Sequence, residues 1–352
     1  MIYYLLRRIR YSLLVLWGVV TLVFLLFNVL PADPARLTMG QRSDPASLAN
    51  ARREMNLDKP IFTRYLLYLN DLSPLSIFKT DSTGAAEYKS LSLLPLPTQY
   101  VLVMKWPHLG RSYRTRKEVS AILTEALPGT VLLALTAMTL ATIFGILLGV
   151  LAALKKNTWL DTSAIAASVA GISMPSFFAG LLIAWFFGYL LHSYTGLNMT
   201  GSLWEYDPFT GRHLALRNLI LPAFALGIRP LAVIAQLTRS ALLDTLSQDY
   251  IRTAYAKGIS RTKIIFRHAL PNALNPVITA VSGWLAELLA GSFFVEYIFG
   301  WKGIGKVTVD ALDKFDFPLV MGAVLFTSFI FIVINLFTDL LYAWIDPRVR
   351  LY

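Results

Sequence analysis

Cysteine is absent from this sequence of 352 residues, and charged residues are scarce. The lack of cysteine excludes a disulfide framework and any thiolate metal site. Only 15% of the residues are Asp, Glu, Lys or Arg, whereas a soluble domain carries about 25%. The four histidines, His108, His192, His213 and His268, are scattered without the spacing of metal ligands. No nucleophile–base set or paired carboxylates can be argued from residue order, so we expect no metal, no cofactor and no catalytic site.

Hydrophobic residues make up 56% of the chain, and the mean hydropathy is +0.57. This composition predicts an all-α membrane protein, in which each span needs about 20 apolar residues. The third candidate span is too long for a straight crossing, and Pro175 predicts a kink or a break into two short helices. Gly145 and Gly149 in the second span suggest close helix packing. The six predicted spans are 11–30, 129–154, 162–191, 218–243, 273–294 and 319–345.

The first span is expected to stay in the mature protein. A cleaved signal peptide is the alternative, but the apolar run is long for one and no A-x-A-like site follows it. A long hydrophilic excursion separates this span from the next. The predicted organisation is a cytoplasmic tail with the first span (1–30), an extracytoplasmic region (31–127), a core of five spans (128–346) and a cytoplasmic tail (347–352).

The basic residues decide the orientation and account for much of the net charge of +11. If the N-terminus is cytoplasmic, thirteen Lys and Arg residues fall in the cytoplasmic ends and short loops. The opposite short loops hold five, which are Arg212, Arg217, Lys302, Lys306 and Lys314. Both termini are therefore predicted to be cytoplasmic, and no nucleic-acid partner is needed to explain the charge.

The stretch FGWKGIGKVT, residues 299–308, is close to a phosphate-binding loop. Val307 stands where such a loop needs a Ser or Thr to hold magnesium. No core strand precedes the stretch, and the predicted orientation places it away from cytoplasmic ATP. We therefore reject nucleotide binding here.

The polar segment 248–271 lies between the fourth and fifth spans, on the cytoplasmic side. Asp249 to Ala256 is predicted to form a short helix stopped by Gly258, and Ser260 can cap a second one. Pro271 then marks the entry into the fifth span. This helix–turn–helix suits docking into a groove of a partner, or else it is an amphipathic loop on the anionic leaflet.

The segment resembles the cytoplasmic loop of ABC importer permeases, whose pattern is E-A-A-x-x-x-G, nine residues, then I-x-L-P. The positions that align are Arg252, Thr253, Ala254, Gly258, His268, Leu270 and Pro271. Arg252, Thr253 and His268 depart from the general pattern, but QDYIRTAYAKG is typical of the dipeptide and oligopeptide branch. The other matching stretches, in order, are YLLRRIRYSLLVLWGVVTLVF, LDKPIFTRY, NTWLD, ISMPSFFAGLL, LILPAFALG, LTRSALL, FVEYIFGWKGIGK and NLFTDLLYAWIDPRVR.

The resemblance implies a type I ABC importer permease fold in the bacterial inner membrane. It implies half of a peptide pathway, with a second homologous permease, two cytoplasmic ATPase subunits and an extracytoplasmic solute-binding protein as partners. The coupling loop would consist of Arg252, Thr253, Ala254, Gly258, Leu270 and Pro271. Residues 72–105 look like an insertion relative to the family.

Three charged residues are candidates for the solute pathway. Arg229 and Glu287 lie within predicted spans, where charges are costly and usually face a cavity or bundle interior. Arg229 could instead lie near the outer interface and snorkel. Glu296, with Lys302 and Lys306, could line the solute entrance or belong to a merely solvated loop.

Two other functional classes were weighed against the importer subunit. A secondary transporter or channel working without ATPase subunits would predict internal symmetry and several buried carboxylates, and neither is clear. An intramembrane enzyme would need an acid pair or nucleophile–base set within the spans. Which solute is carried stays open between peptides, nickel complexes and antimicrobial peptides.

Overall fold

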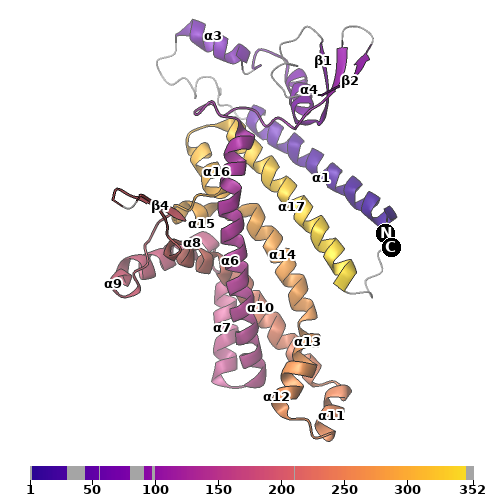
Figure 1. Cartoon of the computed structure of the whole chain (residues 1–352), viewed down its shortest axis with the longest axis vertical. Helices are drawn as coiled ribbons and strands as arrows, with labels where there is room; N and C mark the ends of the chain where they lie inside the picture. The colour runs from indigo at the N-terminus through magenta and orange to yellow at the C-terminus, as the bar shows by residue number, and fades with distance from the viewer. Residues whose placement is uncertain are drawn as a thin grey trace. The chain divides into compact units, whose positions relative to one another are not determined.

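The computed structural model describes residues 2–29, 44–54, 56–79, 91–96, 100–209 and 211–345. The chain forms two compact units. The first comprises residues 1–10, 126–309 and 327–352, and the second comprises residues 11–125 and 310–326. Helices α1, α6, α16 and α17, which are labelled in Figure 1, each contain residues of both units by their residue numbers.

Helices dominate the described residues, with two small antiparallel sheets, so the predicted helical membrane fold is confirmed. The α-helices are α1 (Ile2–Val29), α3 (Pro45–Glu54), α4 (Ile61–Leu72), α6 (Val119–Leu154), α7 (Trp159–Ser173), α8 (Ser176–Trp185), α9 (His192–Thr195), α10 (Arg217–Leu246), α11 (Asp249–Ala256), α12 (Arg261–Lys263), α13 (Leu270–Ala273), α14 (Asn275–Gly291), α15 (Phe293–Ile298), α16 (Ile304–Asp313) and α17 (Phe317–Ile345). Two π-helical segments are η1 (Phe186–Leu190) and η2 (Ile264–Ala269), and the strands are β1 (Leu75–Lys79), β2 (Leu91–Leu96), β3 (Tyr100–Met104), β4 (Trp204–Asp207) and β5 (Gly211–Leu214).

Six membrane crossings are compatible with the described helices. Helices α1, α6, α10 and α17 each contain a continuous stretch that is long and apolar enough to cross. Two further crossings are bent pairs of helices, if each pair makes one span. The first pair runs from α7 to η1 with a bend of 110°, and the second runs from α12 to α14 with a bend of 50°. The tail 347–352 lies outside the described residues.

The 110° bend shows that the chain breaks at Pro175 into two helices, which was the alternative to the predicted kink. Met174, which precedes the proline, has an extended backbone with ψ of 126°, as steric contact with a following proline ring favours. Helix α7 therefore ends at Ser173 and α8 starts at Ser176. The alternative of two short helices, rather than a kinked long one, is the arrangement that forms.

Helix α10 is the centre of the first unit, where it packs against α7, α8, α13 and α14. Its crossing with α6 is close because Gly145 and Gly149 lack side chains. A methyl group at Gly145 would lie 2.8 Å from Ile234, and one at Gly149 would lie 2.6 Å from the backbone oxygen of Ala235. The predicted role of these two small residues is therefore confirmed.

The second unit contains the predicted insertion at 72–105, which forms a three-stranded antiparallel sheet. The strand order is β1-β3-β2, with Leu75 opposite Met104 and Lys79 opposite Tyr100. Helix α6 also begins here, at Val119, ten residues before the predicted start of the second span at 129. The prediction followed the apolar run alone. Burial of Val119 and Leu123 within this unit extends the helix beyond that run.

Candidate functional site

Helix α11 forms over Asp249–Ala256, with the bounds expected from the sequence. Gly258 follows with φ of +74°, a left-handed conformation that is costly for residues with a Cβ atom. The amide of Gly258 donates to the carbonyl of Tyr255, and the amide of Ile259 donates to that of Ala254. Gly258 therefore ends the helix and turns the chain, as predicted.

One face of α11 is fixed to the ends of two spans. Ile251 and Ala254 are buried, and they pack in one cluster with Leu242 of α10 and with Val150 and Ala153 of α6. Displacing α11 alone would expose this apolar contact, so the packing holds α11 against the ends of α6 and α10.

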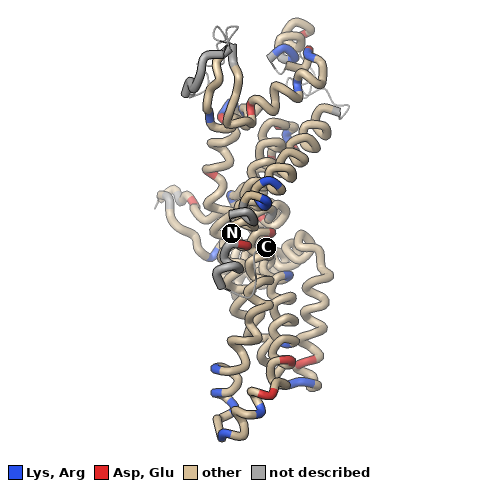
Figure 2. Tube along the Cα trace, turned by 90° about the vertical axis from the view of Figure 1, so that its right-hand side faces the viewer, with Lys and Arg blue, Asp and Glu red and all other residues tan. Residues whose placement is uncertain are grey.

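The opposite face of the loop is exposed and basic. Arg252, Thr253 and Gly258 lie on it, whereas Ala254 points inward. Asp249 forms an exposed ion pair with Arg252 at 3.3 Å. The exposed cations of the loop are Arg252, Lys257, Arg261, Lys263 and Arg267. Figure 2 shows Lys and Arg residues in blue along the lower end of the chain.

The return path from Gly258 to α14 departs in detail from the predicted second helix. Ser260 has the extended backbone of an N-cap, but its side chain makes no capping hydrogen bond. The three residues of α12 lead directly into η2 and α13. Pro271 lies in the first turn of α13, where a missing amide is tolerated, and Leu270 is half-buried.

Hydrogen bonds that the sequence did not reveal connect α11 to the segment that leads into α14. The side-chain Nδ2 of Asn272 donates to the hydroxyl of Tyr250 and to the backbone carbonyl of His268, each at 3.0 Å. The Tyr250 hydroxyl also reaches the His268 carbonyl at 3.4 Å. Tyr250 and Asn272 are 22 residues apart in sequence, so spacing alone gave no signal.

A buried ion pair connects α7 to α10 within the same unit. The guanidinium of Arg239 donates to both carboxylate oxygens of Asp161 at 2.5 and 2.8 Å, and the amide of Asn157 donates to one of them at 2.9 Å. Asp161 is only 3% exposed. This two-pronged geometry fixes direction as well as distance between the helices.

We expect Asp161→Asn to lower the midpoint of thermal unfolding by a few degrees, because Arg239 loses its partner in a partly buried site. The double variant, Asp161→Asn with Arg239→Gln, should be at least as stable as the less stable of the two single variants. Asp249→Asn, which breaks the exposed pair with Arg252, is the matched control and should leave the midpoint unchanged. Additive effects of the Asp161 and Arg239 changes would contradict a specific pairing.

Two of the three candidate pathway residues lie on adjacent helices. Arg229 of α10 places its guanidinium carbon 5.7 Å from the ring centroid of Trp284 on α14, and the Arg229 Nε atom has no hydrogen-bond partner among the described residues. Glu287, three residues beyond Trp284, is exposed in the isolated chain. An exposed carboxylate in a membrane span requires a polar partner or a water-filled space.

Glu296, the third candidate, has very different surroundings. It is 0% exposed and its carboxylate accepts hydrogen bonds from the hydroxyls of Thr130 at 2.8 Å and Ser292 at 2.5 Å. The amides of Lys306, at 3.1 Å, and Gly305 also donate to it. A carboxylate whose acceptor sites are taken up in this way favours a structural role over solute contact.

The glycine-rich stretch therefore holds an acidic side chain, that of Glu296 in the same chain. A methyl group at Gly303 would lie 2.6 Å from the Thr130 hydroxyl, and one at Gly305 would lie 2.5 Å from Phe293. The amide of Ile304 donates to Thr130, and the indole of Trp301 donates to the carbonyl of Gly129. These contacts join the start of α16 to α6, with Lys302 exposed and Lys306 half-buried.

Comparison with known proteins agrees with this architecture. Residues 145–351 match the family of binding-protein-dependent transport system inner membrane components, and residues 1–87 match the N-terminal region of such membrane components. The chain is 36% identical to the di/tripeptide transport system permease protein DppB of Pseudomonas aeruginosa, over 99% of both chains. It is 33% identical to the dipeptide permease DppB of Alkalihalophilus pseudofirmus, over 99% of this chain and 100% of that one.

A further curated relative and a solved structure are similar to this chain at different levels of sequence identity. The probable D,D-dipeptide transport system permease DdpB of Escherichia coli is 36% identical, over 96% of this chain and 94% of its own length. A solved structure of the methionine ABC transporter MetNI, in an inward-facing conformation, aligns with a TM-score of 0.48 and 16% identity, over 64% of this chain and 97% of that chain.

The chain is thus a membrane transport subunit. It belongs to the family of inner membrane components of binding-protein-dependent transport systems. As a permease subunit of an ABC-type importer, it resides in the bacterial inner membrane and works with ATPase subunits and a binding protein. The resemblance of the sequence motifs to the peptide branch of ABC importer permeases is confirmed.

Proposed function

We propose that this permease forms half of a pathway for short peptides. The relatives named above are described as permeases for dipeptides, di/tripeptides or D,D-dipeptides, and the alignments extend over nearly the whole chain. A second homologous permease would complete the pathway. Two cytoplasmic ATPase subunits would supply the energy, as expected for a member of this importer family. An extracytoplasmic binding protein would deliver the peptide.

The observation that carries this proposal is the construction of the loop 248–271. Its basic face is exposed, while Ile251 and Ala254 hold α11 against the ends of α6 and α10. A docked ATPase could therefore move the spans by pushing on α11, which is the stiff contact that rigid-body gating needs. Arg252, Thr253, Gly258 and the neighbouring Ala254, Leu270 and Pro271 are the proposed coupling residues. With this role the loop would lie in the cytoplasm, and the distribution of basic residues favours the same side for both termini.

Arg229 and Glu287 are the proposed solute-facing charges. A short peptide carries an ammonium at one end and a carboxylate at the other, and these two side chains offer the opposite charges. The exposure of Glu287 and the incomplete hydrogen bonding of Arg229 support this assignment. The stacking of Arg229 on Trp284 would hold the guanidinium in place for a carboxylate.

Copurification of the tagged chain in mild detergent tests the proposal. We expect mass spectrometry to identify a second, related permease together with ATPase subunits. The matched comparison is the Arg252→Glu variant, which reverses charge on the exposed face of α11 and should lower ATPase recovery while leaving the second permease in place. Recovery of a stable homo-oligomer without any ATPase would instead favour a secondary transporter or channel. Uptake of labelled dipeptides by the recovered complex then tests the solute.

A further inference from the structure

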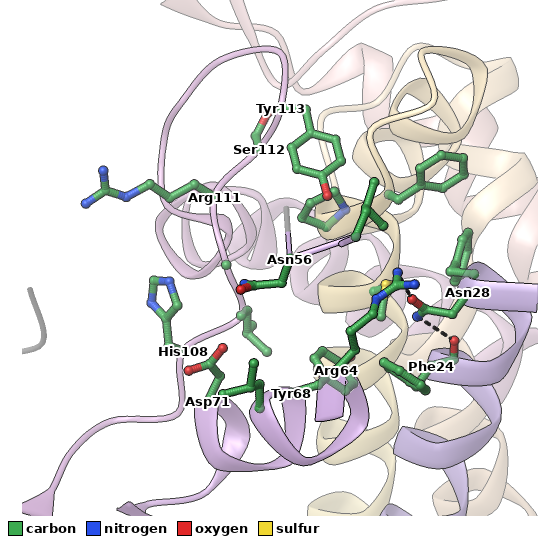
Figure 3. A pocket seen from close by; sticks show the side chains of 18 of the residues that line it. Phe24, Asn28, Asn56, Arg64, Tyr68, Asp71, His108, Arg111, Ser112 and Tyr113 are labelled. Atoms are coloured by element: carbon green, nitrogen blue, oxygen red, sulfur yellow. Dashed lines mark hydrogen bonds between the residues drawn. The ribbon is translucent and has the colours of Figure 1, made fainter. Parts of the chain in front are cut away.

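A hollow of about 410 Å³ lies within the second unit (Figure 3). Its walls are the end of α1, helix α4, the segment 108–116 and the beginning of α17. Since α1 and α17 both contain membrane-crossing stretches, a site at the end of one and the start of the other lies at the boundary between bilayer and water. The volume is within the range of small-ligand pockets, about 300–1,000 Å³.

Two polar groups of α4 line this hollow, one without a hydrogen-bond partner and one without a counter-ion among the described residues. The hydroxyl of Tyr68 is buried and has no hydrogen-bond partner among the described residues. The guanidinium of Arg64 donates to the side-chain oxygen of Asn28, and no carboxylate in the described part of the chain pairs with it. Burial lowers the pKa of Arg64, as expected for a cation without a counter-ion. Both groups are hydrogen-bond donors that an anion would satisfy.

The charge of the lining is also positive. Arg111 and Arg116 are exposed and line the hollow together with Arg64, whereas Asp71 is the one acidic side chain among the described lining residues. Asp71 lies 3.7 Å from the ammonium of Lys105. Burial raises the pKa of Tyr113 to about 12, so its hydroxyl stays a neutral donor, and Figure 3 shows it pointing into the hollow.

The other half of the lining is apolar and aromatic. Phe24 packs on Tyr68 with ring centroids 5.7 Å apart, and Phe27 packs on Phe317 at 5.4 Å. One turn before this end of α1, Leu22 and Leu26 are exposed, as expected for a helix surrounded by hydrocarbon. The hollow thus combines the Arg64 guanidinium and the unpartnered Tyr68 hydroxyl with an apolar wall.

We propose that this hollow binds the phosphate group of an anionic phospholipid, with Arg64 and Tyr68 as the donors. The acyl chains of the bound lipid would extend out of the hollow along the apolar wall beside Phe27. A soluble phosphate shares the chemistry of the head group, but it would leave the apolar wall uncovered. The inference depends on the second unit alone and does not depend on which solute the importer carries.

The test uses the full chain, purified in detergent and stripped of lipid. Phosphatidylglycerol and phosphatidylethanolamine are added in turn, and binding is measured by the rise in the thermal unfolding midpoint. We expect phosphatidylglycerol to bind about tenfold more tightly or better, because charge-assisted hydrogen bonds to Arg64 are stronger for a net anion. Arg64→Gln should remove most of this preference. Arg114→Gln, exposed and outside the lining of the hollow, is the matched control and should keep it.

Tyr68→Phe gives a second measurement that holds even if the Arg64 variant fails to fold. Removing a buried hydroxyl without a partner should raise the midpoint of the lipid-free protein. The same change should reduce the stabilisation by phosphatidylglycerol. A hydroxyl with only a structural role would shift both midpoints equally, and that result would overturn its assignment as a donor to lipid.

The remaining outcomes are equally decisive. Equal binding of the two lipids, or an unchanged preference in Arg64→Gln, overturns the proposal. Stabilisation by inorganic phosphate that matches phosphatidylglycerol and depends on Arg64 keeps the phosphate site but replaces lipid as its source. Stabilisation through Arg64 by a dipeptide, without any effect of phosphatidylglycerol, overturns the proposal in favour of a carboxylate solute.

Discussion

Gly258→Trp should separate ATP hydrolysis from transport in the assembled importer. A Cβ atom at Gly258 would meet nothing within 4 Å in this chain, so the subunit should still insert and fold. The left-handed φ of +74° would nevertheless strain any bulky residue there by about 1–2 kcal/mol, and the new ring would project from the surface proposed to contact the ATPase. We expect peptide uptake to fall roughly tenfold or more, since coupling energies of about 1–3 kcal/mol correspond to 5–150-fold effects.

The measurement is the ratio of peptide transported to ATP hydrolysed in reconstituted vesicles. Gly258→Asn is the matched control, because Asn adopts the left-handed conformation more readily and is much smaller. It should retain most of the coupling. Normal transport by the Trp variant, with ATPase subunits bound, would show that the loop around Gly258 is not the coupling element.

Glu296→Ala should destabilise the subunit by about 3–5 kcal/mol, because it leaves buried donors unpaired. The hydroxyls of Thr130 and Ser292 and the amides of Gly305 and Lys306 would all lose their acceptor. Unfolding of the purified subunit in detergent, followed by circular dichroism, measures the loss. Gly303→Ala should also be destabilising, since the added methyl group displaces the Thr130 hydroxyl.

Glu287→Gln is the control for Glu296, because Glu287 is a carboxylate of the same unit that is exposed. We expect its stability to match that of the wild type, and any defect to be in the concentration dependence of peptide uptake. A stable Glu296→Ala protein whose half-saturating peptide concentration rises would contradict the structural role and return Glu296 to the solute pathway.

The features predicted well from the sequence are those with local causes. Helix α11 has the expected bounds because Gly258 ends it through its own backbone conformation. The break at Pro175 follows from the steric effect of proline on Met174. The candidate spans follow from apolar runs long enough to cross a bilayer.

The features that the sequence could not reveal depend on residues far apart in the chain. Thr130 and Glu296 are 166 residues apart, and Asp161 and Arg239 are 78 apart. The start of α6 at Val119 was missed because tertiary burial, rather than the length of the apolar run, sets it. The sheet β1-β3-β2 was not predicted, because residues 72–105 were interpreted from the sequence only as a probable insertion, without any strands.

The glycine-rich loop 299–308 donates its amides to Glu296, an acidic side chain of the same chain. The carboxylate is covalently part of the same chain, so its effective concentration at the loop amides is set by the fold and never falls by dilution. A free phosphate would have to displace a ligand that cannot diffuse away, whichever side of the membrane supplies it. Backbone amides of a glycine-rich sequence can therefore donate to an acidic side chain of the same chain, and amides paired in this way are not available to an external anion.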